Sequence, residues 1–168
     1  FLIHPDSEPG GTVYAVNTAD EIGTKYYSAI TDFLAERYTR EDERYGRAVN
    51  YIVGNEVGQN KVWNNMGPKL VWDYVDEYAR TLSLTNTIVK SHYSGARTYI
   101  SLDHFWDENI PADSMWKYDN KKIINLLNEG IKSQGDIPWH VAFHPYPQNL
   151  FEPRFWNDDK ATDDFDAD

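Results

Sequence analysis

Short apolar segments alternate with longer segments along this chain, and the two kinds have different periodicities. In the longer segments apolar residues recur at intervals of three and four, which predicts helices over residues 24–38, 68–82 and 119–131. The short segments are rich in β-branched and apolar residues, which predicts strands over residues 12–16, 48–53, 98–102 and 139–143. We interpret residues 58–67 and 85–90 as connections. Strands that alternate with helices in this way imply right-handed βαβ crossovers, so we predict an α/β fold built on a parallel sheet.

The last three predicted strands share a feature at their carboxyl ends, where polar and aromatic residues gather. They end in Asn55-Glu56, in Asp103-His104-Phe105-Trp106 and in His144-Pro145-Tyr146. Proteins built on parallel sheets place their chemistry at such ends. A carboxylate at the end of a buried strand costs free energy unless it meets a partner or a substrate. We therefore predict a site with Glu56 as a catalytic acid; the alternative is that Glu56 caps the next helix or pairs with an arginine.

Two architectures place a site at the carboxyl ends of strands. One is a (β/α)8 barrel, and the other is an open, doubly wound sheet. An open sheet usually carries a Gly-rich phosphate loop after an early strand, but Gly10-Gly11 precedes a predicted strand and no nucleotide-binding fingerprint is present. The missing fingerprint counts against the open sheet, but both a (β/α)8 barrel and an open α/β domain with an unrelated ligand stay open on this pattern.

The composition narrows the classes of partner. A length of 168 residues suits one domain with a substantial core, so we assign residues 1–168 to a single domain. The net charge of −11 argues against nucleic acid and against an anionic membrane surface, because both are negatively charged. Aromatic residues make up 15% of the chain, and they build surfaces that stack on sugar rings as well as cores. The absence of cysteine excludes disulfides and thiolate metal sites but leaves the cellular compartment open.

Other kinds of site lack their sequence signatures. The five histidines contain no pair with the helical spacing of a zinc protease. No Gly-x-Ser-x-Gly segment marks a serine hydrolase. Residues 157–168 include six Asp and one Lys without the spacing of an EF-hand, so we interpret them as an acidic tail or a truncated loop. We predict no metal and no cofactor.

Three short segments together carry a resemblance to a known group of enzymes. They are Leu2-Ile-His-Pro-Asp6, Gly54-Asn-Glu-Val-Gly58 and Phe143-His-Pro-Tyr146. The strand that ends in Asn55-Glu56 resembles the fourth strand of clan A glycoside hydrolases, the cellulase-like (β/α)8 barrels, and the strand that ends in His144-Pro145-Tyr146 is similar to their sixth. More narrowly, the chain looks like part of an uncharacterised bacterial family of cellulase-like barrels. It would cover roughly strands three to six.

The resemblance implies an activity and two central residues. It implies a retaining glycoside hydrolase that acts on a polysaccharide or oligosaccharide, with Glu56 as acid/base. Asn55 would bind the sugar 2-hydroxyl. His144 and Tyr146 would orient the nucleophile or bind sugar hydroxyls; the alternatives are a histidine satisfied by a backbone carbonyl and a tyrosine packed at the rim.

The third strand end supplies the remaining predicted substrate-binding residues, which are Asp103, His104 and Trp106. Because Asp103 and His104 are adjacent, on a strand they would point to opposite faces, so we expect only one of them to face the barrel interior. Trp106 is a candidate stacking platform for a sugar ring, and core packing is its alternative role.

The second carboxylate of a retaining enzyme is missing from its expected place. In the clan resembled, a nucleophilic Glu ends the seventh strand, whereas here the one later Glu is Glu152, which does not end a predicted strand. A whole barrel takes about 250 residues. We therefore expect an incomplete barrel that is inactive alone, with activity in the full-length protein. A non-catalytic carbohydrate-binding or interaction module on the same scaffold is the alternative.

The expected partners follow from an incomplete barrel. We expect a carbohydrate substrate, and either a homo-oligomer or the remainder of the barrel to cover exposed sheet edges. Light scattering would test this, since a stable monomer would count against it. An extracellular or periplasmic location is favoured over others.

Overall fold

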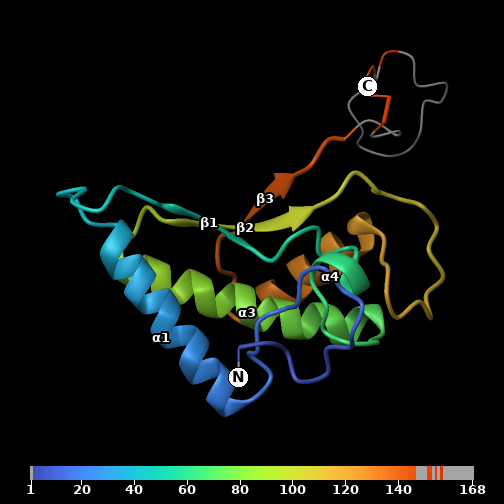
Figure 1. Ribbon diagram of the computed structural model, residues 1–168, viewed down its shortest axis with the longest axis horizontal. Coiled ribbons are helices and arrows are strands. Elements are labelled where there is room, and N and C mark those ends of the chain that lie inside the picture. Colours follow the sequence, from blue (N-terminus) through green and yellow to red (C-terminus); the bar gives the residue numbers. More distant parts are fainter. Residues whose placement is uncertain (1, 147–150, 153, 155, 157–168) are drawn as a thin grey trace.

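The computed structural model describes residues 2–146, 151, 152, 154 and 156, and three strands form its sheet (Figure 1). Strand β1 spans Asn50–Val53, β2 spans Arg97–Leu102 and β3 spans His140–Phe143. The strands are parallel and lie in the order β1-β2-β3. The prediction of an α/β fold with a parallel sheet is confirmed. The acidic segment 157–168 lies outside the described residues.

Four helices accompany the sheet. Helix α1 spans Glu21–Tyr38, α2 spans Asn60–Trp63, α3 spans Val71–His92 and α4 spans Asn120–Ser133. The three predicted helices correspond to α1, α3 and α4, while the short α2 lies in a segment that we interpreted as a connection. No helix in the described part of the chain is long and apolar enough to cross a bilayer.

Helix α3 continues through residues 85–90, where we expected a connection, so that interpretation was wrong. Two polar residues of this segment, Thr85 and Asn86, are buried and bonded to neighbouring elements. The Thr85 hydroxyl lies 2.6 Å from the Tyr27 hydroxyl of α1, and Asn86 donates to the Thr98 hydroxyl of β2 at 2.9 Å. Tertiary hydrogen bonds therefore satisfy side chains that weaken an isolated helix.

The predicted strand over residues 12–16 does not form. Instead, isolated bridges join Ile3 to Val16 and Tyr14 to Asn65. The amide groups of Thr12 and Val13 both donate to the carbonyl of Val62, at 2.9 Å each. The amide of Ala15 donates to the carbonyl of Asn65. The segment therefore pairs with α2 and the residues that follow it, and not with a strand.

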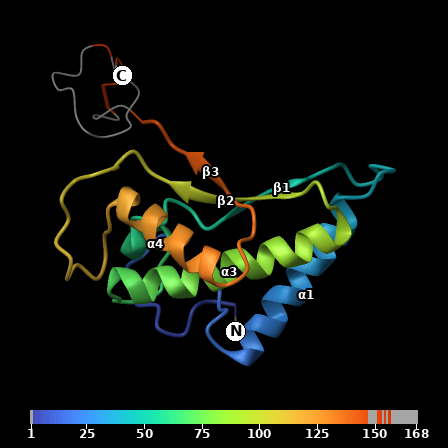
Figure 2. The ribbon, with the colours of Figure 1, turned by 180° about the vertical axis from the view of Figure 1, so that it is seen from behind.

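Helices α3 and α4 lie on the same side of the sheet, and α1 packs against α3 (Figures 1 and 2). The core lies between the sheet and α3 and α4. Its fully buried members come from β2, α3 and α4 and include Ile100, Leu102, Tyr74, Tyr78, Leu82, Ile123 and Leu127. The opposite face of the sheet is open: Ile52 is 58% exposed, and its register partner Tyr99 is half-buried beside exposed His140.

Candidate functional site

The turn after β1 holds Glu56 in an unusual backbone conformation. Glu56 has φ 39°, in the left-handed region, and Gly54 has φ 77° two residues earlier. A side chain in this region costs about 1–2 kcal/mol. A Cβ atom on Gly54 would lie 3.0 Å from both Val57 Cγ1 and Asn64 Oδ1, so a side chain here would crowd both residues. The turn persists because neighbouring elements hold it.

Two buried tyrosines of α3 hold the turn after β1 through hydrogen bonds to its backbone. The Tyr78 hydroxyl donates to the carbonyl of Val53 at 2.7 Å, and the Tyr74 hydroxyl donates to the carbonyl of Val57 at 2.8 Å. These two carbonyls flank the segment that contains Glu56. Burial raises the pKa of both tyrosine hydroxyls, so they remain protonated donors.

Strand β2 holds the turn from the side. The Glu56 amide donates to Ser101 Oγ at 3.1 Å, and the Val57 amide donates to the Ser101 carbonyl at 3.0 Å. Helix α3 and strand β2 thus fix the backbone on both sides of Glu56. This support is consistent with a strained position that serves a site, since strain persists only where the surroundings impose it.

The carboxylate of Glu56 meets the imidazole of His144. Glu56 Oε1 lies 2.8 Å from His144 Nδ1, and the two side chains are 13% and 29% exposed. The His144 amide donates to the Leu102 carbonyl at 2.9 Å, which extends the β2–β3 pairing past the end of β3. His144 Nε2 lies 3.5 Å from Ser101 Oγ. The partner of Glu56 is therefore a histidine, not the arginine or helix cap of the alternative interpretation.

Asp103 follows β2 and is 2% exposed. Its Oδ2 accepts from Gln59 Nε2 at 2.7 Å, and its Oδ1 accepts from Asn120 Nδ2 and from the Phe105 amide. Burial raises the pKa of Asp103, and the negative charge of Glu56 adds to this, while the hydrogen bonds from Gln59, Asn120 and Phe105 oppose it. Glu56 and Asp103 are therefore close enough to influence each other electrostatically.

These residues border a cleft of about 410 Å³ at the carboxyl ends of the strands. Its lining consists of Glu56, Gln59, Trp63, Asp103, His104, Phe105 and Tyr146. The His104 ring lies 4.0 Å from the Phe105 ring and edge-on to Tyr146 at 6.3 Å between centroids. Segments after β1, β2 and β3 thus converge on one cleft, together with the short helix α2.

The structure brings most of the predicted site residues together. Glu56, Asp103, His104 and Tyr146 line the cleft, and His144 contacts Glu56. We expected only one of Asp103 and His104 to face the barrel interior; both line the cleft, because β2 ends at Leu102 and side-chain alternation stops there. Asn55 and Trp106 are half-buried and are not part of the lining.

Three lining residues were not predicted as site residues, namely Gln59, Trp63 and Phe105. Gln59 and Trp63 belong to the start and end of α2, whose four residues are too few to show a helical period. Phe105 lies inside the aromatic segment after β2, and its position next to His104 is the sequence signal that points to it.

The comparison with protein families covers the whole chain. A family model described as a family of unknown function, DUF5722, matches residues 1–168. The chain belongs to this family. No match was found among curated proteins, and none was found among solved structures. Membership of this family assigns no activity to the chain, so its cleft is the feature that bears on function.

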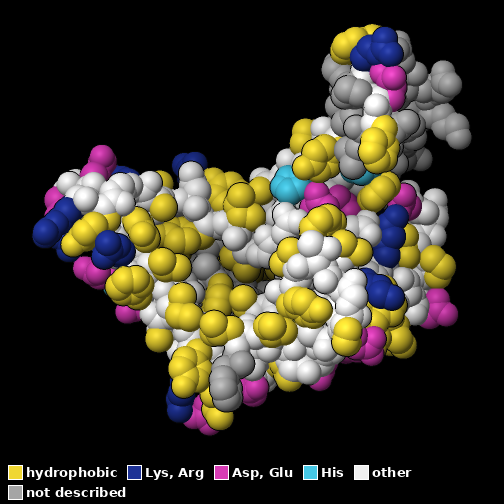
Figure 3. Space-filling model, in the orientation of Figure 1, with side chains coloured by type: hydrophobic (Ala, Val, Ile, Leu, Met, Phe, Trp, Pro, Cys, Tyr) yellow, Lys and Arg dark blue, Asp and Glu magenta, His cyan; other side chains and the backbone are white. Residues whose placement is uncertain are grey.

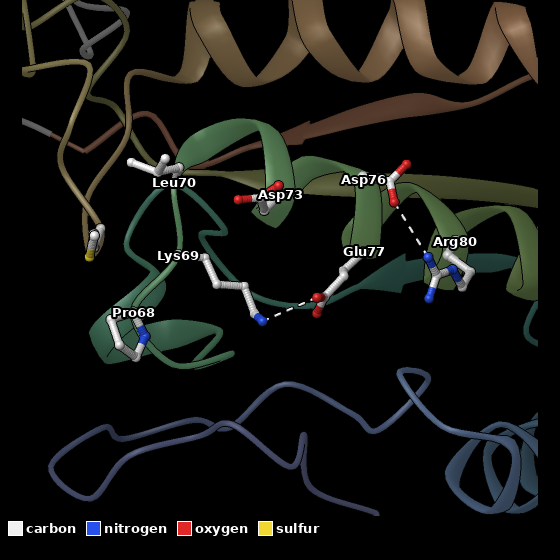
Figure 4. Close-up of a pocket in the computed structure, with 8 residues that line it drawn as sticks. Pro68, Lys69, Leu70, Asp73, Asp76, Glu77 and Arg80 are labelled. Carbon is white, nitrogen blue, oxygen red and sulfur yellow. Dashed lines mark hydrogen bonds and ion pairs between the residues drawn. The ribbon is translucent and has the colours of Figure 1, made fainter.

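This DUF5722 chain has a second concave region, of about 500 Å³, beside the start of α3 (Figure 4). Lys69 points toward Glu77 there, with Nζ 3.1 Å from Oε1, and also contacts Asp6 Oδ2 at 2.8 Å. His4 Nε2 lies 2.6 Å from Glu77 Oε2. Among the described residues, His4, Asp6 and Glu77 have ligand atoms close enough together for a metal ion. The ammonium group of Lys69 already supplies the cation, so we interpret the cluster as a clamp between the N-terminal segment and α3.

Proposed function

We propose that the chain is part of a (β/α)8 barrel. Its three strands are sequential neighbours, and the crossover helices α3 and α4 lie on the same face of the sheet (Figures 1 and 2). A doubly wound sheet has helices on both faces, whereas a barrel is wound in one direction. Within the described residues one face of the sheet is uncovered and β1 and β3 are edge strands, which supports the proposal because further strands would close the sheet.

Helix α1 adds support for neighbours beyond the described residues. Its exposed apolar side chains are 40–58% accessible and gather over the helix (Figure 3); they are Ile22, Tyr26, Ile30, Phe33 and Leu34. In a barrel each helix packs between two others, which would cover such a surface. The predicted homo-oligomer is an alternative way to cover it, and both stay predictions.

For the function, we propose a retaining glycoside hydrolase that acts on a polysaccharide or oligosaccharide, with Glu56 as acid/base. The observation that carries the proposal is a carboxylate in a strained turn, hydrogen-bonded to His144, in a cleft at the carboxyl edge of a parallel sheet. General acid catalysis needs a carboxyl group held within reach of the leaving oxygen. The support from α3 and β2 supplies such positioning.

The rest of the cleft suits a sugar. Gln59 Nε2 donates to Asp103, which orients the amide so that its oxygen is available to accept from a ligand hydroxyl. Trp63 and Phe105 offer aromatic surface, on which the apolar face of a sugar ring packs. We propose that His104 and Tyr146 complete the binding surface, and that Asn55 and Trp106 contribute at its margin.

The described residues offer no carboxylate that suits the role of the nucleophile. Asp103 is the second carboxyl group of the cleft, but it is 2% exposed and its oxygens accept from Gln59, Asn120 and Phe105. We assign it the role of orienting Gln59. Glu152 pairs with Arg154 at 2.6 Å and is not part of the lining. A second function, a non-catalytic carbohydrate-binding module, is favoured by this lack of an available second carboxylate among the described residues.

The test is hydrolysis of a panel of aryl glycosides by the full-length protein and its Glu56→Gln variant. Loss of a general acid lowers turnover by about 10²–10⁴-fold, with the largest loss for poor leaving groups. Glu152→Gln, which changes an exposed ion pair, should retain wild-type turnover. Unchanged turnover in Glu56→Gln would remove the proposed role. Oligosaccharide binding without hydrolysis by the full-length protein would favour the binding module.

A further inference from the structure

The hydroxyl group of Ser101 lies in a fully buried position between Glu56 and His144, with no exposed surface. Its oxygen accepts from the Glu56 amide at 3.1 Å. A backbone N–H can only donate, so this contact uses a lone pair of the hydroxyl and leaves its hydrogen in need of an acceptor. A buried donor without an acceptor costs about 1–3 kcal/mol.

His144 Nε2 is the acceptor that the site offers. It lies 3.5 Å from Ser101 Oγ, and within the described residues this hydroxyl has no further polar contact. If Nε2 accepts, it carries no hydrogen, and the hydrogen of the neutral ring must lie on Nδ1. Nδ1 then donates to Glu56 Oε1 at 2.8 Å. The hydrogen bonds run from the Glu56 amide through Ser101 and His144 and return to the Glu56 carboxylate.

We propose that Ser101 is a positioning residue whose hydroxyl donates to His144 Nε2, which supports the Nδ1–H tautomer that the Glu56 carboxylate requires and holds Glu56 as a hydrogen-bond acceptor in the ligand-free site. Its consequence for catalysis rests on the proposed role of Glu56 as acid/base. A neutral imidazole in this tautomer carries a single ring hydrogen, on Nδ1, and the Glu56 carboxylate carries none. The pair must therefore gain one proton before Glu56 can act as an acid. Placing that proton on Nε2 requires the Ser101 hydroxyl to turn and accept instead of donate.

A second histidine of the chain provides an internal control. His4 Nδ1 accepts from the Asp6 amide at 3.2 Å, so its ring hydrogen lies on Nε2, which donates to Glu77 at 2.6 Å. Both histidines contact a glutamate, yet through different ring nitrogens. The structure therefore predicts opposite neutral tautomers for His4 and His144 in the same protein.

The experiment is a long-range ¹H–¹⁵N correlation spectrum of the histidine rings in the ¹⁵N-labelled chain at neutral pH. Protonated and unprotonated ring nitrogens differ in chemical shift, and the variants His144→Gln and His4→Gln assign the signals. We expect a protonated Nδ1 in His144 and a protonated Nε2 in His4. An Nε2–H tautomer or a doubly protonated ring for His144 would overturn the proposal without any variant of Ser101.

The role of Ser101 is tested with Ser101→Ala and Ser101→Thr. The first removes the hydroxyl, and we expect the His144 Nε2 signal to shift as it loses its hydrogen bond, while Nδ1 stays protonated against Glu56 and His4 keeps its own signature. The second retains a hydroxyl and should restore the wild-type signature. A folded Ser101→Ala variant with the wild-type His144 spectrum would refute the role.

The two proposals can fail separately. The spectrum needs no substrate, so an Nδ1–H ring together with unchanged turnover in Glu56→Gln would refute the glycoside hydrolase and leave the tautomer standing. An Nε2–H ring together with an inactive Glu56→Gln variant would refute the tautomer and leave the glycoside hydrolase standing.

Discussion

Replacing Tyr74 by phenylalanine would leave two buried polar groups without a partner. The Tyr74 hydroxyl donates to the Val57 carbonyl at 2.8 Å and accepts from Asn64 Nδ2 at 2.7 Å. Both Tyr74 and Asn64 are buried, and the ring itself would keep its packing against Tyr118. Each unsatisfied buried group costs about 1–3 kcal/mol, so we expect Tyr74→Phe to lower the free energy of unfolding by about 2–6 kcal/mol. Typical domains have only about 5–15 kcal/mol in total.

Urea unfolding followed by tryptophan fluorescence measures this change, with an unaltered m-value as the sign that only stability has changed. Tyr78→Phe removes a single hydrogen bond, to the Val53 carbonyl, and should cost less. Tyr51→Phe is the matched control, because its hydroxyl donates to the Ala48 carbonyl in an exposed position and should change stability by less than about 0.5 kcal/mol. A Tyr74→Phe variant as stable as Tyr51→Phe would refute the view that α3 supports the turn of Glu56.

Two further predictions concern the same turn and the clamp at the N-terminal segment. Gly54→Ala should lower the free energy of unfolding by about 1–2 kcal/mol or more, because φ is 77° and the new Cβ meets Val57 and Asn64. Gly130→Ala, in open space on α4, should instead raise it by about 0.5–1 kcal/mol; equal effects of the two in urea unfolding would contradict this. Burial alone would raise the pKa of Glu77, but hydrogen bonds and charges from His4 and Lys69 lower it below 4.5. Its contribution to stability is therefore present above pH 4.5 and lost as the pH falls through the lowered pKa, so the stability difference between wild type and Glu77→Gln should shrink in acid. A difference independent of pH in urea unfolding would argue against the clamp.

The secondary structure was largely predictable because its signals are local. The apolar strands and the three- and four-residue spacing of α1, α3 and α4 are visible within short windows of sequence. The predictions failed where hydrogen bonds to residues distant in the sequence determine the local structure. Residues 85–90 continue α3 because Asn86 bonds to β2, and residues 12–16 form no strand because their amides bond to the loop around α2.

The candidate site divides in the same way. Glu56, Asp103 and His144 were predictable, since parallel strands bring their carboxyl ends to one edge. The side-chain directions beyond those ends were not, because alternation stops where a strand ends. For this reason Asp103 and His104 both line the cleft, while Asn55 and Trp106 do not. Gln59 lies at the start of α2, and a helix of four residues is too short to show a periodic pattern in the sequence.

The sequence by itself determined that polar side chains follow three parallel strands and that Glu56 is among them. Only the tertiary structure decided what Glu56 contacts. Ser101 lies 45 residues from Glu56 along the chain, and His144 lies 88 residues from it. The register of β2 with β1 and β3 brings the three together, and hydrogen-bond partners at such separations have no periodic signature in a sequence. The tautomer of His144 depends on Ser101, 43 residues away, whereas His4 takes its donor from the nearby Asp6 amide.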